Sequence, residues 1–247
     1  MKKKNNIQIH ISDNALLHLL MSGLECFNLR FWRGKITQKR GPTETAGTLW
    51  GYFIGGDGTE DDHVRVEFVS QDVLADRHKS WVVLQKDTTW VKSQLVQARW
   101  PHLSLIGDFH THPYETYSEC NEACGWKFSD GDCDYFQHTW NNQKELELWK
   151  RCKVSLLLTI AHLDRVHDEK RWDPDVVENH IVRFQIDRFR FWITAYAIDL
   201  TDQSSFVVSP GNRQCRKQVY IDIPTINGTT NWFVYNDLVR ISRADWN

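Results

Sequence analysis

The feature that most constrains the fold of this chain is an apolar run, Leu103 to Ile106, that leads into His110-Thr111-His112-Pro113. Such a run predicts a buried strand, and a strand places side chains i and i+2 on the same face. His110 and His112 are therefore expected to point the same way, with Thr111 turned to the opposite face. Pro113 cannot donate a backbone hydrogen bond, so we expect the strand to end there. Two imidazoles on one face at a strand end are typical of a metal site.

A carboxylate for the same site is available in Ser129-Asp130-Gly131-Asp132, shortly downstream. Two histidines and one carboxylate supply three zinc ligands, and three protein ligands with a water in the remaining position are the catalytic form of a zinc site. We expect Asp132 to be the third ligand, with Asp130 and Asp134 as local competitors. The alternative is that Asp132 is a helix N-terminal carboxylate favoured by the helix dipole, and that Ser129 is an N-cap residue.

Hydrophobic periodicity predicts alternating strands and helices along the chain. Strands are expected over residues 5–11, 44–55, 63–69, 103–113, 154–161, 181–200 (as one long strand or two joined ones), 206–208, 219–221 and 232–235. Helices are expected over about 15–26, capped by residues 12–14, over about 90–99, capped by residues 87–89, and after Asp132 toward Trp149. Residues 55–58 predict a turn, so the second and third strands should form a hairpin.

Composition and charge narrow the class of protein. The 247 residues have a formal net charge of −2, which gives no electrostatic case for binding nucleic acid or an anionic membrane. No apolar run reaches the length of about 18 residues that a membrane-spanning helix needs. The Lys2-Lys3-Lys4 start is not followed by an unbroken apolar segment, so export is not expected. The six cysteines are not needed as disulfides in a chain of this size, and we expect a reducing, cytoplasmic compartment.

Three segments taken together resemble the motif of the JAMM (also called MPN+ or JAB) zinc metallopeptidases. That motif is a glutamate in a strand context, then His-Ser/Thr-His-Pro, then Ser-x-x-Asp. Glu44, His110–Pro113 and Ser129–Asp132 match it in this order. The residues from Glu44 to Gly47 also look like the family's Glu-Thr-Gly-Gly-type segment, with Ala46 in place of one glycine.

The resemblance implies an α+β fold with a mixed β-sheet flanked by helices. It covers residues 10–162, which would form a JAB/MPN-like metallopeptidase core of the cytidine-deaminase-like type. Residues 163–247 are expected to form a β-rich C-terminal extension packed on the same domain.

The resemblance also assigns a role to each residue of the motif. His110, His112 and Asp132 would bind a catalytic Zn²⁺. Glu44 would hold the water, take its proton and deliver that proton to the leaving amine. Ser129 would donate a hydrogen bond to the oxyanion of the tetrahedral intermediate. This chemistry needs no covalent intermediate and so no cysteine nucleophile.

Members of this family commonly cleave ubiquitin or ubiquitin-like proteins from their targets or trim them. The implied function is hydrolysis of isopeptide or peptide bonds after the C-terminal tail of such a modifier, with a prokaryotic modifier-conjugation or antiviral system as one setting. The partners would be the modifier and its conjugates, with no nucleic acid and no membrane. Two alternatives are a non-catalytic MPN-type scaffold and a DNA-repair-associated relative with a similar His-x-His motif. A zinc nucleobase deaminase would need a Cys-x-x-Cys pair, which the chain lacks.

One segment departs from the family pattern, because sixteen residues, Pro113 to Phe128, separate the second histidine from Ser129. Both ends of this insertion hold site residues, so it borders the active site and bears on substrate access and specificity. Trp126, together with Trp140 in the following helix, is a candidate for lining a substrate groove. Cys120 and Cys124, with Cys133, have the spacing of a second metal site but no evident fourth ligand, and packing as small apolar residues is the favoured interpretation.

Overall fold

The computed structural model describes residues 6–28, 42–54, 62–78, 80–141, 152–164, 175–199, 219–224 and 226. Its strands are β1 (Ile7–Ile11), β2 (Ala46–Ile54), β3 (Asp62–Gln71), β4 (Asp76–Arg77), β5 (Val82–Val83), β6 (Ser104–Tyr114), β7 (Cys152–His162), β8 (Asp175–Glu178), β9 (Ile181–Ile186), β10 (Phe189–Asp199) and β11 (Val219–Asp222). Its helices are α1 (Asp13–Asn28), α2 (Lys86–Arg99), α3 (Tyr117–Glu122) and α4 (Asp130–Asn141).

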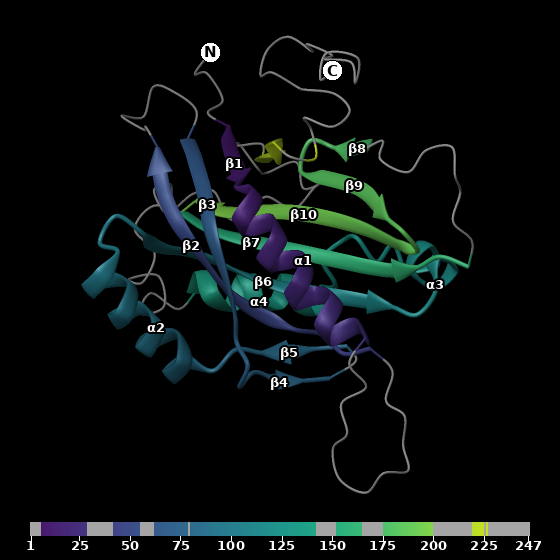
Figure 1. Ribbon diagram of the computed structural model, residues 1–247, viewed down its shortest axis with the longest axis horizontal. Helices are drawn as coiled ribbons and strands as arrows, with labels where there is room; N and C mark the ends of the chain where they lie inside the picture. Colours follow the sequence, from purple (N-terminus) through teal and green to yellow (C-terminus); the bar gives the residue numbers. More distant parts are fainter. Residues whose placement is uncertain are drawn as a thin grey trace, which may run out of the picture.

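The fold is α+β and is built on one large sheet, with few helices among the described residues (Figure 1). Nine strands form this sheet in the order β11-β1-β3-β2-β6-β7-β10-β9-β8, and β4 and β5 form a separate hairpin. The sheet is mixed, because β1 runs parallel to β3 and β11, and β6 runs parallel to β7, while the other pairs are antiparallel. The mixed sheet expected from the sequence is therefore confirmed, and β6, with the two histidines, is its central strand.

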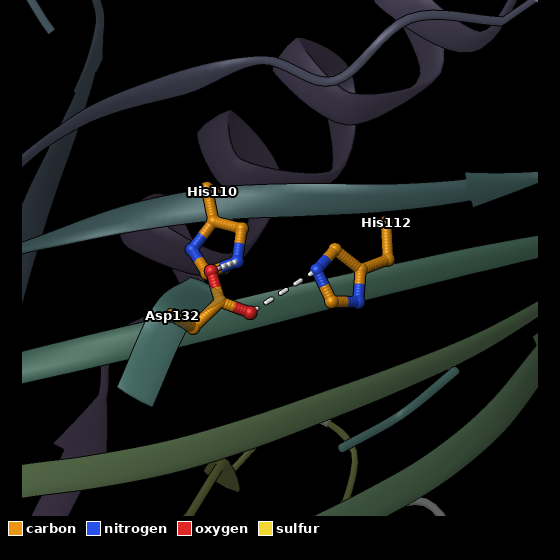
Figure 2. A group of neighbouring side chains, drawn as sticks. All are labelled: His110, His112 and Asp132. Atoms are coloured by element: carbon orange, nitrogen blue, oxygen red, sulfur yellow. Dashed lines mark ion pairs between the residues drawn. The ribbon is translucent and has the colours of Figure 1, made fainter. Parts of the chain in front are cut away.

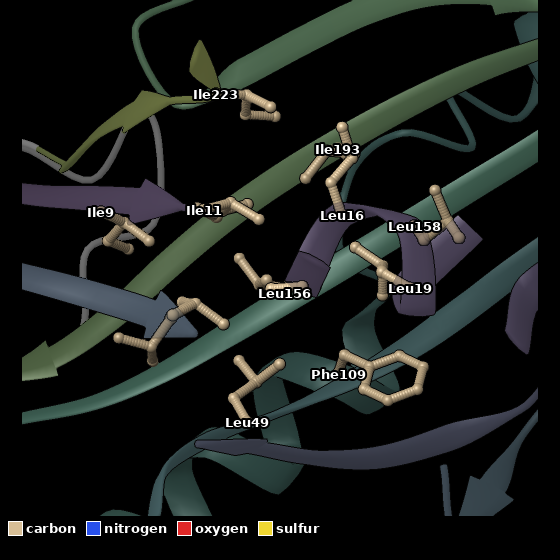
Figure 3. Close-up of a cluster of buried hydrophobic side chains, with 14 of the residues drawn as sticks. Ile9, Ile11, Leu16, Leu19, Leu49, Phe109, Leu156, Leu158, Ile193 and Ile223 are labelled. Carbon is tan, nitrogen blue, oxygen red and sulfur yellow. The ribbon is translucent and has the colours of Figure 1, made fainter. Parts of the chain in front are cut away.

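Helix α1 covers one face of the sheet and forms the main hydrophobic core with it (Figure 1). Ser12 begins the helix, since its hydroxyl accepts a hydrogen bond from the Ala15 N–H at 3.2 Å, as the sequence predicts. Leu16 and Leu19 of α1 lie in one core cluster with side chains from the strands of the sheet (Figure 3). The labelled core residues of these strands are Ile9, Ile11, Leu49, Phe109, Leu156, Leu158 and Ile193.

The alternation of side chains along β6 and β7 sends the polar residues to the other face. Phe109 of β6 and Leu156 of β7 lie in the core beside α1. His110 and His112, at the alternate positions of β6, therefore lie on the opposite face, together with Lys153 and Thr159 of β7. Helix α4 and the insertion pack on this second face. The core beside α1 and the candidate site therefore lie on opposite faces of the sheet.

The strands after residue 162 belong to the same sheet as the strands before it. β10 pairs with β7 along the whole of both strands, and β9 and β8 extend the sheet from β10. β11 lies at the other edge and pairs with β1. The segment 181–200 is therefore two joined strands, which is one of the two forms expected.

Two predicted boundaries are wrong. Pro113 does not end β6, which continues to Tyr114. The N–H of Thr111 points to the β2 side, where it donates to the Thr45 carbonyl, so the nitrogen of Pro113 faces the same side beyond the end of β2. The missing donor therefore disrupts no described pairing. Helix α2 begins at Lys86 rather than near Trp90, after an N-cap at Gln85 that makes no side-chain capping bond.

Several predicted segments lie outside the described residues. They are the turn at 55–58, the end of the helix toward Trp149, and the strands at 206–208 and 232–235. Among the helices that the structure describes, none has the length and apolar character needed to cross a membrane.

Candidate metal centre

Three predicted ligands come together on the face of the sheet opposite α1. Figure 2 shows Asp132, from the first turn of α4, facing the imidazoles of His110 and His112 on β6. The Asp132 carboxylate oxygens lie 3.1 Å from His110 Nε2 and 3.5 Å from His112 Nε2. One ligand atom from each side chain lies within 4.8 Å of the other two, and these residues form the one such cluster found in the described part of the chain.

The donor atoms fit a metal ion. His110 Nε2 is buried, and its near neighbour is the Asp132 carboxylate oxygen at 3.1 Å, with which it makes an ion-pair contact rather than a regular hydrogen bond. A buried nitrogen lone pair without a donor is costly unless a cation occupies the space in front of it. Two imidazole nitrogens and a carboxylate oxygen are a ligand set typical of catalytic zinc. The three residues could therefore hold a metal ion.

Asp132 is held in its orientation by Ser129. The backbone N–H and the hydroxyl of Ser129 each donate to Asp132 Oδ2 at 2.7 Å, and the Ser129 hydroxyl accepts from the Asp132 N–H at 3.2 Å. These reciprocal bonds are a capping box at the start of α4. Burial would raise the pKa of Asp132, but the adjacent His110 and His112 outweigh burial and hold the pKa of this carboxyl well below its usual range. Asp132 is therefore an anion that faces both imidazoles.

Glu44 lies beside the cluster although it is distant in sequence. The next residue, Thr45, exchanges two bonds with Thr111: its N–H donates to the Thr111 hydroxyl and its carbonyl accepts from the Thr111 N–H, both at 2.9 Å. The Glu44 N–H donates to the His78 carbonyl at 2.9 Å. Burial raises the pKa of Glu44 to about 8, His112 opposes this increase, and Asp132 adds to it. A buried carboxyl with a pKa near neutrality beside a metal centre is typical of a general acid–base.

The insertion of residues 113–128 contributes contacts that the sequence did not predict. The Gly125 carbonyl lies 3.0 Å from His112 Nδ1 and also accepts from the Thr159 hydroxyl at 2.9 Å. The Phe128 ring meets the His110 ring edge-on, with centroids 5.5 Å apart. A backbone carbonyl acts here, so no side chain at position 125 reveals the contact in the sequence.

Asp108, two residues before His110, forms a buried ion pair on the same face. Its carboxylate lies 2.6 Å from Lys153 Nζ and accepts from Ser155 at 2.7 Å and from the Tyr135 hydroxyl at 3.2 Å. Burial would lower the pKa of Lys153, but Asp108 outweighs burial and holds the pKa of this ammonium above its usual range. The ion pair joins β6, β7 and α4 next to the metal ligands.

The remaining residues singled out in the sequence, two tryptophans and three cysteines, are not among the three candidate ligands. The Trp126 ring stacks on Trp192 with centroids 5.5 Å apart. Trp140 lies in α4, but its side chain is outside the described residues, so the groove-lining role of both residues stays a prediction. Cys120 is buried while Cys124 and Cys133 are exposed, and they are not among the residues of the described metal cluster.

Neither a comparison with protein-family models nor a comparison with curated protein sequences finds a match for this chain.

Proposed function

We propose that this protein is a zinc-dependent metallopeptidase of the JAMM type that hydrolyses isopeptide or peptide bonds. One observation carries the proposal: His110, His112 and Asp132 form a cluster, and Glu44 lies beside it. The motif requires these four residues to converge from three segments of the chain, and the fold brings them to one face of β6. The proposal also assigns a JAB/MPN-like core to residues 10–162, in keeping with the order of α1, the β2–β3 hairpin, α2, β6, α4 and β7.

Each residue of the centre has a separate role in the proposed hydrolysis. Zinc held by the two histidines and Asp132 would supply a Lewis acid and a water of lowered pKa. The Glu44 carboxylate takes a proton from the attacking water and delivers it to the leaving amine. The Ser129 backbone N–H holds the Asp132 carboxylate. The Ser129 hydroxyl, at the edge of the centre, is the donor proposed for the oxyanion, to which it would turn from Asp132 Oδ2.

The substrate proposed is the extended C-terminal tail of a ubiquitin-like protein, and the surroundings of Glu44 support it. The segment of residues 72–85, which contains β4 and β5, is bonded to Glu44 through His78. β5 pairs with β4 and with no other described strand, so its second edge can accept an extended peptide. This segment and α2 with its C-cap expose large apolar side chains suited to a protein partner: Val73, Leu74, Trp81, Val83, Trp90, Val91, Leu95 and Trp100.

Metal analysis of the purified protein tests the centre. We expect about one zinc per chain in the wild type and its loss in His110→Ala. His102→Ala, which removes an exposed histidine just before the same strand, should keep the metal and serves as the matched control. A wild type that binds no more zinc than His110→Ala would overturn the proposal.

Cleavage of ubiquitin-like fusion proteins tests the chemistry. Glu44→Gln should keep the zinc and lose activity by about 100-fold or more, since it removes general acid–base catalysis. If Glu44→Gln cleaves as well as the wild type, the assignment of Glu44 as the base is wrong even where zinc is bound.

A further inference from the structure

The insertion that separates His112 from Ser129 lies against the metal centre at both histidines. Gly125 and Phe128, near its end, contact His112 and His110 respectively. The Phe128 ring also meets the Tyr196 ring of β10 edge-on, with centroids 4.2 Å apart. The end of the insertion therefore contacts the imidazoles of both histidines.

The Gly125 carbonyl determines which nitrogen of His112 is free. A carbonyl oxygen only accepts hydrogen bonds, so the His112 Nδ1 at 3.0 Å must carry the hydrogen. A neutral imidazole with its hydrogen on Nδ1 has its lone pair on Nε2. Nε2 is the atom that faces Asp132 across 3.5 Å in the cluster. The hydrogen bond that His112 Nδ1 donates to the Gly125 carbonyl thus leaves Nε2 available to a metal ion.

The Gly125 carbonyl is itself held in place from several directions. The Gly125 N–H donates to the Cys120 carbonyl at 2.8 Å, and the Thr159 hydroxyl donates to the Gly125 carbonyl at 2.9 Å. The adjacent Trp126 carbonyl accepts from the Thr194 hydroxyl of β10 at 2.7 Å. These bonds tie the end of the insertion to β7 and β10, the two strands that follow β6 in the sheet.

Residue 125 must also be small for the carbonyl to reach His112. A Cβ at this position would lie 2.2 Å from Cε2 of the Tyr114 ring, so either the ring or the backbone at residue 125 would have to move. The preceding residue, Cys124, has a φ of 49°, in the left-handed region of backbone conformation. The small residue at 125 and the left-handed backbone at 124 are therefore both part of the conformation that brings the Gly125 carbonyl to His112.

We propose that the insertion of residues 113–128 is a positioning element of the metal centre, in which the Gly125 carbonyl fixes the tautomer and orientation of His112 and thereby sets the metal affinity. The inference rests on the proposed metal site and gives this chain's departure from the JAMM pattern a function. Partners of this kind on a ligating histidine strengthen metal binding by about 10–100-fold. Gly125 and Thr159 are positioning residues, since neither touches the metal.

Zinc affinity of variants, measured by competition with a chromophoric chelator, tests the role of the carbonyl. Gly125→Ala should weaken zinc binding by about tenfold or more. The double variant Tyr114→Ala/Gly125→Ala gives the new methyl group room and should recover affinity toward that of Tyr114→Ala alone. Thr159→Val should weaken binding by a smaller factor, and Thr159→Ser, which keeps the hydroxyl, should not. Equal zinc affinity in Gly125→Ala and the wild type would overturn the proposal.

A spectroscopic measurement on metal-free protein separates positioning from a general loss of structure. Long-range ¹H–¹⁵N correlation spectra of histidine-labelled protein, with His112 assigned by comparison with His112→Gln, should show the hydrogen of His112 on Nδ1. A hydrogen on Nε2 with none on Nδ1 in the wild type would overturn the inference. Because this measurement needs no metal, it tests whether the Gly125 carbonyl fixes the tautomer of His112 even if the wild type binds no zinc. Absence of zinc binding would instead overturn the proposed function and, with it, the effect on metal affinity.

Discussion

At the scale of single residues, the burial of Glu44 raises its pKa toward the range useful for catalysis, and the same burial makes the charged carboxylate unfavourable in the folded state. Its pKa is about 8 in the folded protein and 4.5 in the unfolded chain, mainly because burial disfavours its charged form. Between these pH values the folded state keeps a proton that the unfolded chain releases. The free energy of unfolding of the metal-free protein should therefore fall as the pH rises through this window.

Glu44→Gln tests whether the buried carboxylate lowers the free energy of unfolding at high pH, because glutamine has nearly the same shape and no charge. We expect the variant to be more stable than the wild type by about 2–4 kcal/mol at pH 8, with little difference near pH 5. Urea denaturation with a chelator present, at both pH values, measures the effect. A gain of the same size at both pH values would mean that the pKa of Glu44 is not raised.

At the scale of elements, the contact between α4 and the sheet depends on a buried charge. Lys153 of β7 pairs with Asp108 of β6, and the Tyr135 hydroxyl of α4 bonds to both. Asp132, on the same helix, thus faces the histidines from a helix that is anchored to their own strand. Removing one member of a buried ion pair leaves the other charge without compensation, which is the costly case.

We therefore expect Lys153→Met to lower the free energy of unfolding by about 3–5 kcal/mol. The double variant Asp108→Leu/Lys153→Met removes both charges and should recover much of this loss. Lys127→Met, at an exposed lysine, is the matched control and should change stability by less than about 0.5 kcal/mol. Chemical denaturation of the four proteins decides the point, and equal losses in the single and double variants would contradict it.

At the scale of the whole molecule, periodicity predicted the strands of the large sheet except β8, and the face on which the centre lies. The alternation of His110 and His112 along β6 required only the geometry of a strand. The capping pattern from Ser129 to Asp132 predicted the start of α4, so the third ligand also had a local basis. The position of Glu44 beside the histidines depends on long-range strand pairing and was implied only by the resemblance. The order of strands in the sheet was not predicted.

What the sequence did not predict depends on contacts between distant segments or on backbone atoms. Lys153 was not identified as the partner of Asp108, because nothing local to either residue specifies their pairing across β6 and β7. Gly125 acts through a carbonyl, which every residue has. The error at Pro113 has a similar cause, since the residue is tolerated only because β2 ends before reaching it.

The centre joins the middle strand of the sheet to α4, so a bound metal should stabilise the whole fold. At a free zinc concentration about 100 times the dissociation constant, the free energy of unfolding should rise by about 2.7 kcal/mol. For a chain of this size, that increase corresponds to roughly 5–10 °C in Tm. Thermal unfolding with and without zinc measures the shift, and chelation should reverse it. His112→Ala should show no zinc-dependent shift, whereas a shift equal to that of the wild type would mean that the metal binds elsewhere in the chain.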